Sequence, residues 1–292
     1  MAKILSGKEV CEALNTELIR RSAALGEKGI TPTLAIVRVG ENPSDLSYEK
    51  GAVKRAELVG VKVVHFVLPE NCPKEQLLIV IDQVNADASI HGCLMFRPLP
   101  KHLKKDQEEI CNRLDPQKDV DSMTSLSNAG VYEGRSDLGF PPCTAQACME
   151  ILDYYHYDCT GRRAAILGRS LVIGRPAALM LMHRNATVTV LHTRTKNVAE
   201  HIAQAELVIC AAGVLNSVTA DMVRPGQTVI DVSMNWNPEK LTPKGKGGMC
   251  GDCDFSAVEP IVEAITPVPG GVGAVTTSVL MKHVILAAER AK

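Results

Sequence analysis

Hydrophobic positions along the chain follow two alternating spacings, which together predict an α/β fold. Some segments have apolar residues every three or four positions, as in an amphipathic helix, while short continuous apolar runs between polar, glycine or proline residues indicate buried strands. In the first half, helices are predicted at 6–25, 47–61 and 74–85, and strands at 33–40, 61–68 and 92–100. Such alternation is typical of βαβ units around a parallel sheet.

The alternation breaks between residues 114 and 144, where a polar loop leads into a proline-rich segment around Pro142. It then resumes, with strands predicted at 162–170, 187–193, 207–213 and 228–233 and helices at 175–185, 196–204 and 275–291. We therefore predict two α/β domains with a cleft between them. The first comprises residues 1–143 plus a returning segment, 275–292, and the second comprises residues 144–274.

Composition and charge exclude several classes of protein. Hydrophobic residues make up 46% of the chain, which is ample for buried cores, and a formal net charge of −1 argues against a nucleic-acid partner. The sequence shows no signal-like start and no apolar run that we expect to span a bilayer, so no membrane partner is predicted. The scattered cysteines indicate a reduced, cytoplasmic protein.

Metal chemistry is not expected. The histidines lack metal-ligand spacing, so no metal site is predicted. Cys250 and Cys253 have Cys-x-x-Cys spacing, but no second pair lies nearby in the sequence. Small residues near a turn are the favoured interpretation, with a redox pair or half a zinc site as the alternative.

The second predicted domain opens with a strand, a glycine-containing turn and a helix, as in a Rossmann-type dinucleotide-binding domain. Gly168 and Gly174 lie where the backbone would approach a phosphate and where the strand would pass close to the helix. Ser170 occupies the place of the middle glycine of the usual fingerprint, and an ordinary strand–helix turn is the alternative.

The end of the next strand indicates which cofactor is bound. An NAD-binding enzyme usually carries an acidic residue there, which bonds the ribose hydroxyls. This chain has Thr193, Arg194 and Lys196 instead, which suit a 2′-phosphate and favour NADP, with NAD the less favoured cofactor. A solvated Arg194 is the alternative, and His192 is a further candidate for a cofactor contact.

A second glycine-rich segment precedes the final helix. Gly270, Gly271 and Gly273 follow two prolines and would let backbone amides approach a flat ligand or a phosphate. A plain helix-entry loop seldom needs so many glycines. We therefore predict a ligand site in this loop.

Together these motifs resemble the methylenetetrahydrofolate dehydrogenase/cyclohydrolase family, and the resemblance runs from Met1 to Lys292. The family's NPxxxxYxxxK is echoed by Asn42, Pro43 and Tyr48, its KDVDG by Lys118–Ser122, its PCTP by Pro142–Ala145, its GRSxxVGxP by Gly168–Pro176 and its PGGVGPMT by Pro269–Thr276. Several long motifs in one order are far more specific than any one of them. The resemblance implies a folate-binding catalytic domain, an NADP-binding domain and a homodimer.

The departures from the family pattern cluster around the implied folate site. The family's key acid/base lysine, four residues after the tyrosine, is Ala52 here, and the glutamine that partners it in VQLP is Phe96. Strand alternation predicts that Phe96 faces the ligand and Arg97 faces away. The serine of the family's NPAS is Asp45, and a glycine is replaced by Ser122.

The chemistry that the resemblance implies separates the two activities. Hydride loss from methylenetetrahydrofolate leaves a cation stabilised by two nitrogens, so the dehydrogenase mainly needs positioning. Cyclohydrolase action needs proton transfer by a group such as a desolvated lysine, which alanine cannot provide. We therefore expect an NADP-dependent methylenetetrahydrofolate dehydrogenase with weak or absent cyclohydrolase activity. The alternatives are a full bifunctional enzyme that uses Asp45 or water as a proton relay, and a non-catalytic binding paralogue.

The resemblance also assigns roles to individual residues. Tyr48 and Asp121 are the catalytic candidates, with Tyr48 packing on a tetrahydrofolate derivative and Asp121 accepting N–H bonds from the pterin; a loop-capping Asp121 is the alternative. The expected folate-binding loop consists of Pro269, Gly270, Gly271, Val272 and Gly273. The expected cofactor-binding residues are Gly168, Arg169, Ser170, Gly174, His192, Thr193, Arg194 and Thr276.

Overall fold

The computed structural model describes residues 1–242 and 245–291, and the chain divides into two compact units. One unit, here called the three-stranded unit, contains Glu12–Cys143 and the residues from Thr277 onward. The other, called the six-stranded unit, contains Met1–Cys11 and Thr144–Thr276.

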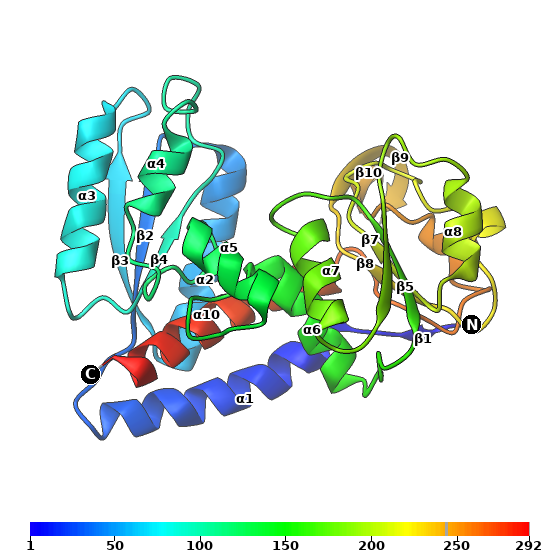
Figure 1. Cartoon of the computed structure of the whole chain (residues 1–292), viewed down its shortest axis with the longest axis horizontal. Coiled ribbons are helices and arrows are strands. Elements are labelled where there is room, and N and C mark those ends of the chain that lie inside the picture. The colour runs from blue at the N-terminus through cyan, green and yellow to red at the C-terminus, as the bar shows by residue number, and fades with distance from the viewer. Residues whose placement is uncertain (243–244, 292) are drawn as a thin grey trace. The chain divides into compact units, whose positions relative to one another are not determined.

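The three-stranded unit is built on a parallel sheet with the strand order β3–β2–β4 (Figure 1). Every residue of the central strand β2 is buried, as expected where helices cover both faces of a parallel sheet. The strands are β2 (Thr33–Val39), β3 (Lys62–Leu68) and β4 (Gly92–Met95). The helices are α2 (Pro43–Val59), α3 (Lys74–Ala86), α4 (Gln107–Asn112) and α5 (Ser125–Glu133), with parts of α1 (Gly7–Gly26) and α10 (Val272–Arg290).

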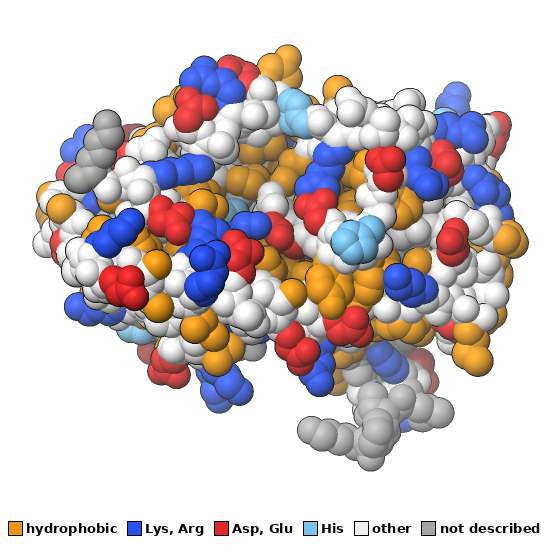
Figure 2. Space-filling model, turned by 90° about the horizontal axis from the view of Figure 1, so that it is seen from below, with side chains coloured by type: hydrophobic (Ala, Val, Ile, Leu, Met, Phe, Trp, Pro, Cys, Tyr) orange, Lys and Arg blue, Asp and Glu red, His pale blue; other side chains and the backbone are white. Residues whose placement is uncertain are grey.

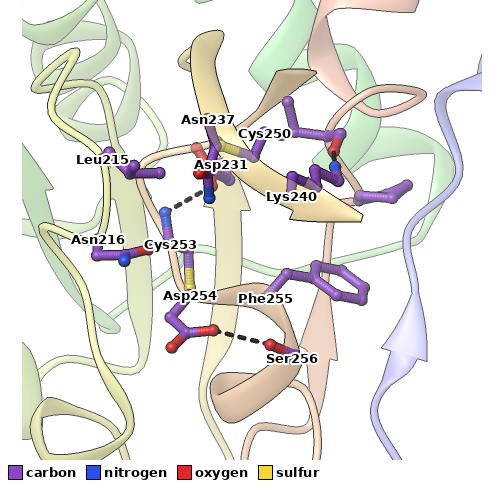
Figure 3. Close-up of a pocket in the computed structure, with 13 residues that line it drawn as sticks. Leu215, Asn216, Asp231, Asn237, Lys240, Cys250, Cys253, Asp254, Phe255 and Ser256 are labelled. Atoms are coloured by element: carbon purple, nitrogen blue, oxygen red, sulfur yellow. Dashed lines mark hydrogen bonds between the residues drawn. The ribbon is translucent and has the colours of Figure 1, made fainter. Parts of the chain in front are cut away.

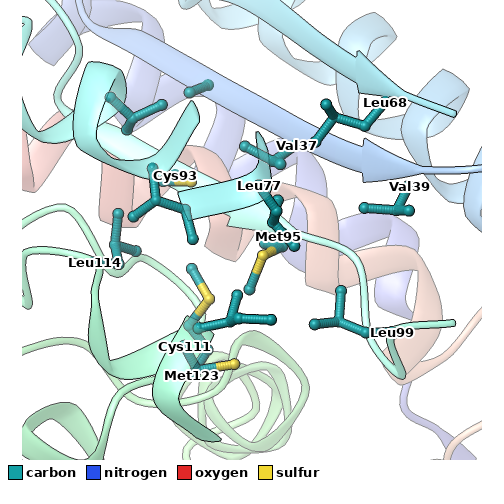
Figure 4. Close-up of a cluster of buried hydrophobic side chains, with 14 of the residues drawn as sticks. Val37, Val39, Leu68, Leu77, Cys93, Met95, Leu99, Cys111, Leu114 and Met123 are labelled. Atoms are coloured by element: carbon teal, nitrogen blue, oxygen red, sulfur yellow. The ribbon is translucent and has the colours of Figure 1, made fainter. Parts of the chain in front are cut away.

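One face of this sheet packs a continuous hydrophobic core (Figure 4). Alternate residues of the strands, such as Val37 and Met95, point to this face because successive side chains of a strand alternate. Leu77 and Ile81 of α3 and Leu114 after α4 pack against them. The fully buried part of this core is aliphatic and sulfur-containing, and Phe66 of β3 packs against it from a partly buried position.

Helix α2 begins earlier than predicted because its first turn carries strong start signals. Asn42 is the N-cap and accepts a hydrogen bond from Ser44 N, and Pro43 occupies the first helical position. The helix ends at Gly60, whose φ of 75° is the left-handed conformation of a C-terminal cap. The buried face comprises Ala52, Ala56 and Val59.

The six-stranded unit has a parallel sheet with the order β1–β11–β8–β7–β5–β6, confirming the α/β class and the Rossmann-type domain (Figure 1). Its strands are β1 (Lys3–Ile4), β5 (Arg163–Leu167), β6 (Thr187–Leu191), β7 (Leu207–Cys210), β8 (Thr228–Asp231) and β11 (Ala264–Ile265). Its helical elements are α6 (Cys143–Tyr154), α7 (Gly174–Met182), α8 (Val198–Gln204), η1 (Ala220–Met222) and α9 (Phe255–Val258).

The N-terminal residues do not join the domain in which the sequence placed them. Strand β1 pairs in parallel with β11, and Leu5 N donates to Ile265 O at 2.8 Å. The predicted first domain, 1–143, therefore loses Met1–Cys11 to the six-stranded unit. A two-residue strand carries too short an apolar pattern to be predicted from the sequence alone.

Two further segments differ from the sequence-based expectation. Residues Asn235–Thr242 and Gly245–Cys250 form an antiparallel pair, β9 and β10, where no strand was predicted. Helix α10 is long and apolar enough by length and composition to cross a membrane, contrary to the expectation of no such run. In the structure 67% of its apolar window is buried inside the protein, as in the core helix of a globular fold.

Candidate functional site

The glycine turn after β5 has no room for side chains at two positions. Gly168 has a φ of +113°, and a Cβ built there would lie 2.1 Å from Ala211 O. A Cβ on Gly174, the first residue of α7, would lie 2.2 Å from Gly168 O. Strand, turn and helix therefore approach as closely as a dinucleotide-binding turn requires. Arg169 and Ser170 are exposed at this turn, and Ser170 Oγ accepts a hydrogen bond from Ile173 N at 3.1 Å.

The register of three parallel strands brings the predicted cofactor residues to one edge of the sheet. Leu167 of β5 pairs with Leu191 of β6 and with Cys210 of β7, so the residues that follow each strand lie side by side. His192 Nδ1 accepts from Arg194 N at 3.2 Å, which fixes the turn after β6. The side chains of Thr193 and Arg194 are exposed.

A buried aspartate that sequence reasoning missed organises the loop after β7. Asp252 accepts hydrogen bonds from Ala212 N at 2.7 Å, Gly213 N at 3.0 Å and Val214 N at 2.9 Å. Asp231, at the end of β8, accepts a hydrogen bond at 2.9 Å from the main-chain N–H of Cys253, the residue that follows Asp252. Burial raises the pKa of Asp231 to about 6. In the sequence, Asp252 lies in the run Gly-Asp-Cys-Asp, but only the spacing of the two cysteines was interpreted in this segment.

The predicted glycine loop lines a small pocket within the six-stranded unit. A cavity of about 240 Å³ is bordered by Asp231, Val232, Met234 and Pro267–Ala274. Gly270 has a φ of +107°, which favours glycine there. Thr276, predicted to contact the cofactor, is buried and donates to Gly273 O at 3.1 Å.

A larger hollow of about 480 Å³ lies in the same unit (Figure 3). Its walls come from the segments after β7, β8 and β11 and from the β9–β10 pair, including Asn237 and Lys240. Lys240 Nζ contacts Met249 O and lies 3.5 Å from Val268 O. Cys250 and Cys253 are free thiols, and the described residues contain no group of three or more metal-binding side chains.

In the three-stranded unit, two of the predicted site residues are brought together. Tyr48 on α2 and Phe96 after β4 form an edge-to-face pair, with ring centroids 6.0 Å apart and an interplanar angle of 85°. Ala52, one turn along the helix from Tyr48, is fully buried. Residue 52, where the family resemblance implies a lysine, is therefore a packed apolar site.

Asp121 is held from two sides. Its Oδ1 accepts a hydrogen bond from Cys143 N at 2.9 Å, and its Oδ2 lies 3.7 Å from Nη2 of Arg97. Burial raises the pKa of the Asp121 carboxyl, while the Cys143 N–H and the Arg97 charge act in the opposite direction. The expectation that Arg97 faces away from the site is wrong, because β4 ends at Met95 and strand alternation does not extend to residue 97.

Ser122, where the family resemblance implies glycine, adopts a backbone conformation suited to glycine. Its φ is 52°, and its side chain is buried. Within the described part of the chain, Ser122 Oγ has no hydrogen-bond partner. This replacement thus combines a left-handed backbone with an unsatisfied hydroxyl.

A charged cluster lies beside Tyr48 on α2. Glu49 accepts from Arg38 Nε at 2.8 Å and lies 2.8 Å from His65 Nδ1. Burial raises the pKa of the nearby Asp45 carboxyl, the candidate proton relay of the bifunctional alternative. Among the described residues on the face in Figure 2, charges of both signs are interspersed.

The chain matches two protein-family models. Residues 5–121 match the catalytic domain of tetrahydrofolate dehydrogenase/cyclohydrolase, and residues 142–292 match the NAD(P)-binding domain of the same family. The curated bifunctional protein FolD of Carboxydothermus hydrogenoformans is 48% identical over 99% of this chain and 98% of its own length. FolD of Clostridioides difficile is 43% identical over 98% of this chain and 96% of its own.

Solved structures match over the same length. The bifunctional FolD of Campylobacter jejuni superposes with a TM-score of 0.92 at 37% identity, covering 99% of both chains. The dehydrogenase–cyclohydrolase of Trypanosoma brucei, complexed with NADP cofactor and inhibitor, superposes with a TM-score of 0.91 at 30% identity. That match covers 99% of this chain and 98% of the trypanosomal one.

Proposed function

Since the chain belongs to the tetrahydrofolate dehydrogenase/cyclohydrolase family, we propose that it oxidises 5,10-methylenetetrahydrofolate with NADP and hydrolyses the methenyl product weakly or not at all. The observation that carries this proposal is the fully buried Ala52 beside the Tyr48–Phe96 pair. No proton-transferring side chain exists at residue 52 or at residue 96. General acid–base groups contribute about 10²–10⁴-fold to such reactions, so hydrolysis should slow by that order.

The three-stranded unit would bind the folate. Tyr48 would pack on the substrate, and the ionised Asp121 would accept N–H bonds from the pterin edge. Because the dehydrogenase reaction needs positioning more than proton transfer, these two groups suffice for it. In the six-stranded unit, the family resemblance assigns folate contacts to the main-chain groups and small side chains of Pro269, Gly270, Gly271, Val272 and Gly273.

The six-stranded unit has the features that NADP requires. The close approach of strand, turn and helix at Gly168 and Gly174 would let a pyrophosphate lie against the main chain at the start of α7. Arg169, Ser170, His192, Thr193, Arg194 and Thr276 would hold the cofactor, with Thr193 and Arg194 on the 2′-phosphate. When bound, NADP supplies the hydride acceptor. With no acid after β6, the site should prefer NADP to NAD.

The proposal has two competitors that one pair of assays separates. In the full bifunctional enzyme, Asp45 or a water would relay protons, and in the non-catalytic paralogue neither reaction would turn over. We expect purified protein to reduce NADP with methylenetetrahydrofolate, measured as NADPH absorbance, without speeding the decay of methenyltetrahydrofolate absorbance, which the full bifunctional enzyme would accelerate. NADP binding by calorimetry without any turnover would favour the paralogue.

We further propose a cytoplasmic homodimer, which the family resemblance implies. In the six-stranded unit, β6 is an edge strand that exposes main-chain groups and Val190. A second copy would cover that edge. Light scattering coupled to size-exclusion chromatography should give about twice the mass of the chain, 31.4 kDa, and a monomer would refute this part of the proposal.

A further inference from the structure

Arg97 reaches the proposed pterin anchor although the family resemblance gives its position, a leucine in VQLP, no role. Its Nη2 donates to the main-chain oxygen of Asp121 at 3.4 Å and lies 3.7 Å from Asp121 Oδ2. The side chains of Arg97 and Asp121 are 22% and 25% exposed, so both are partly shielded yet open to a ligand.

The contacts of Cys143 and Arg97 with the Asp121 carboxylate leave one of its two oxygens available to a ligand. Asp121 Oδ1 is occupied by Cys143 N at 2.9 Å, whereas the 3.7 Å separation between Arg97 and Oδ2 is an ion-pair distance longer than a hydrogen bond. Oδ2 therefore retains its capacity to accept N–H bonds from a ligand. Arg97, anchored on the main chain of the same residue, holds positive charge beside that oxygen.

We propose that Arg97 is a positioning residue that keeps the Asp121 carboxylate ionised and oriented for the pterin of a folate. This inference rests on the proposed function, because it takes the folate as the ligand of Asp121. A guanidinium stays protonated throughout the physiological pH range, unlike the lysine that the family uses. Arg97 can thus support binding without moving protons.

Burial and a neighbouring carboxyl both work against ionisation of Asp121. Besides Arg97, the groups that face it are the buried Asp119 carboxyl and the Cys143 thiol. His283 lies behind that thiol at 3.7 Å, and burial lowers its pKa to about 4, so it stays neutral near pH 7. Burial and Asp119 both raise the pKa of Asp121, and Arg97 is the one cation among these facing groups that opposes them.

The test compares Arg97→Leu and Arg97→Lys with the wild type in the full chain, using calorimetric titration with tetrahydrofolate from about pH 5.5 to pH 8. We expect Arg97→Leu to weaken tetrahydrofolate binding about tenfold at pH 7, as for one lost charged partner, and more at lower pH. Without Arg97 the pKa of Asp121 rises, so binding should fail at a higher pH on acidification. Arg97→Lys should recover part of the loss.

Arg135→Leu is the matched control, because Arg135 is exposed and pairs with Asp137 elsewhere in the same unit. The Arg135→Leu variant should bind tetrahydrofolate as tightly as the wild type does. Tetrahydrofolate affinity in Arg97→Leu within about twofold of wild type at every pH would overturn the inference. Equal losses of tetrahydrofolate and NADP affinity with a lower melting temperature would also overturn it, by showing a structural role. If tetrahydrofolate binding depends on Arg97 but the wild-type protein does not reduce NADP with methylenetetrahydrofolate, the proposed dehydrogenase is wrong and this inference still holds.

Discussion

We expect that the two units of the chain have diverged from the family pattern to different extents. In the six-stranded unit the glycine turn is intact, and two positions have no space for a Cβ. In the three-stranded unit the fold and its core are complete, yet Ala52, Phe96 and Ser122 stand where the family resemblance implies lysine, glutamine and glycine. A fold can therefore keep a binding surface while losing groups that move protons, because packing and proton transfer depend on different residues.

The strongest test of the intact unit is Gly168→Ala. Its φ of +113° disfavours any L side chain, and the added Cβ would meet a main-chain oxygen that cannot swing away. We expect a cost of roughly 3 kcal/mol or more and an NADP affinity at least about 100-fold weaker, measured by calorimetry and thermal unfolding. Gly161→Ala shares a positive φ but has open space, so it should bind NADP normally. Normal binding by Gly168→Ala would show that the turn is not the cofactor site.

In the diverged unit, Ala52→Lys should restore no hydrolysis. Residue 52 is fully buried, so a lysine there should cost about 2–4 kcal/mol of folding free energy, measured by urea unfolding. Leu58→Lys, exposed on the same helix, should be nearly neutral. Adding Phe96→Gln gives the ammonium of Lys at residue 52 a partner and space. The effects of the two substitutions on the free energy of unfolding should therefore be non-additive. Strict additivity would mean that residues 52 and 96 do not share one site.

Arg194→Ala should weaken NADP binding selectively, by roughly 1–3 kcal/mol for a charge-assisted phosphate contact, with NAD binding unchanged. Calorimetric titration with both cofactors measures this. Arg163→Ala serves as the control. It removes the same charge at the first residue of β5, at the end of the sheet opposite to the turn after β6 that carries Arg194. If NAD binds more tightly than NADP to the wild type, the cofactor assignment is wrong.

The smallest effect is expected from Ser122→Gly, which should stabilise the protein by about 1 kcal/mol. The change relieves a left-handed φ and removes an unpartnered hydroxyl. Ser122→Ala removes only the hydroxyl, so comparing the two in urea unfolding separates the contributions. A destabilised glycine variant would indicate that Ser122 has an important interaction after all.

The fold could be predicted largely from sequence because parallel strands are short, strongly apolar runs. The β9–β10 pair could not, because its glycine- and lysine-rich residues have low strand propensity and cross-strand pairing decides the structure. The tight turn after β5 could be predicted because Gly168 and Gly174 meet a local steric requirement. Arg97 was misplaced because its direction depends on where β4 ends, and Asp252 was missed because its partners lie far away in sequence.

The central claim is that this chain can oxidise a folate without the means to hydrolyse the product. The most direct measurement follows the decay of methenyltetrahydrofolate absorbance in the presence and in the absence of the wild-type protein. NADPH formation from methylenetetrahydrofolate is measured alongside. We predict that NADPH forms while methenyltetrahydrofolate accumulates and decays at close to its uncatalysed rate. Enzyme-dependent hydrolysis at a rate comparable to the protein's own dehydrogenase would contradict the claim and make Asp45 the first candidate for the proton relay.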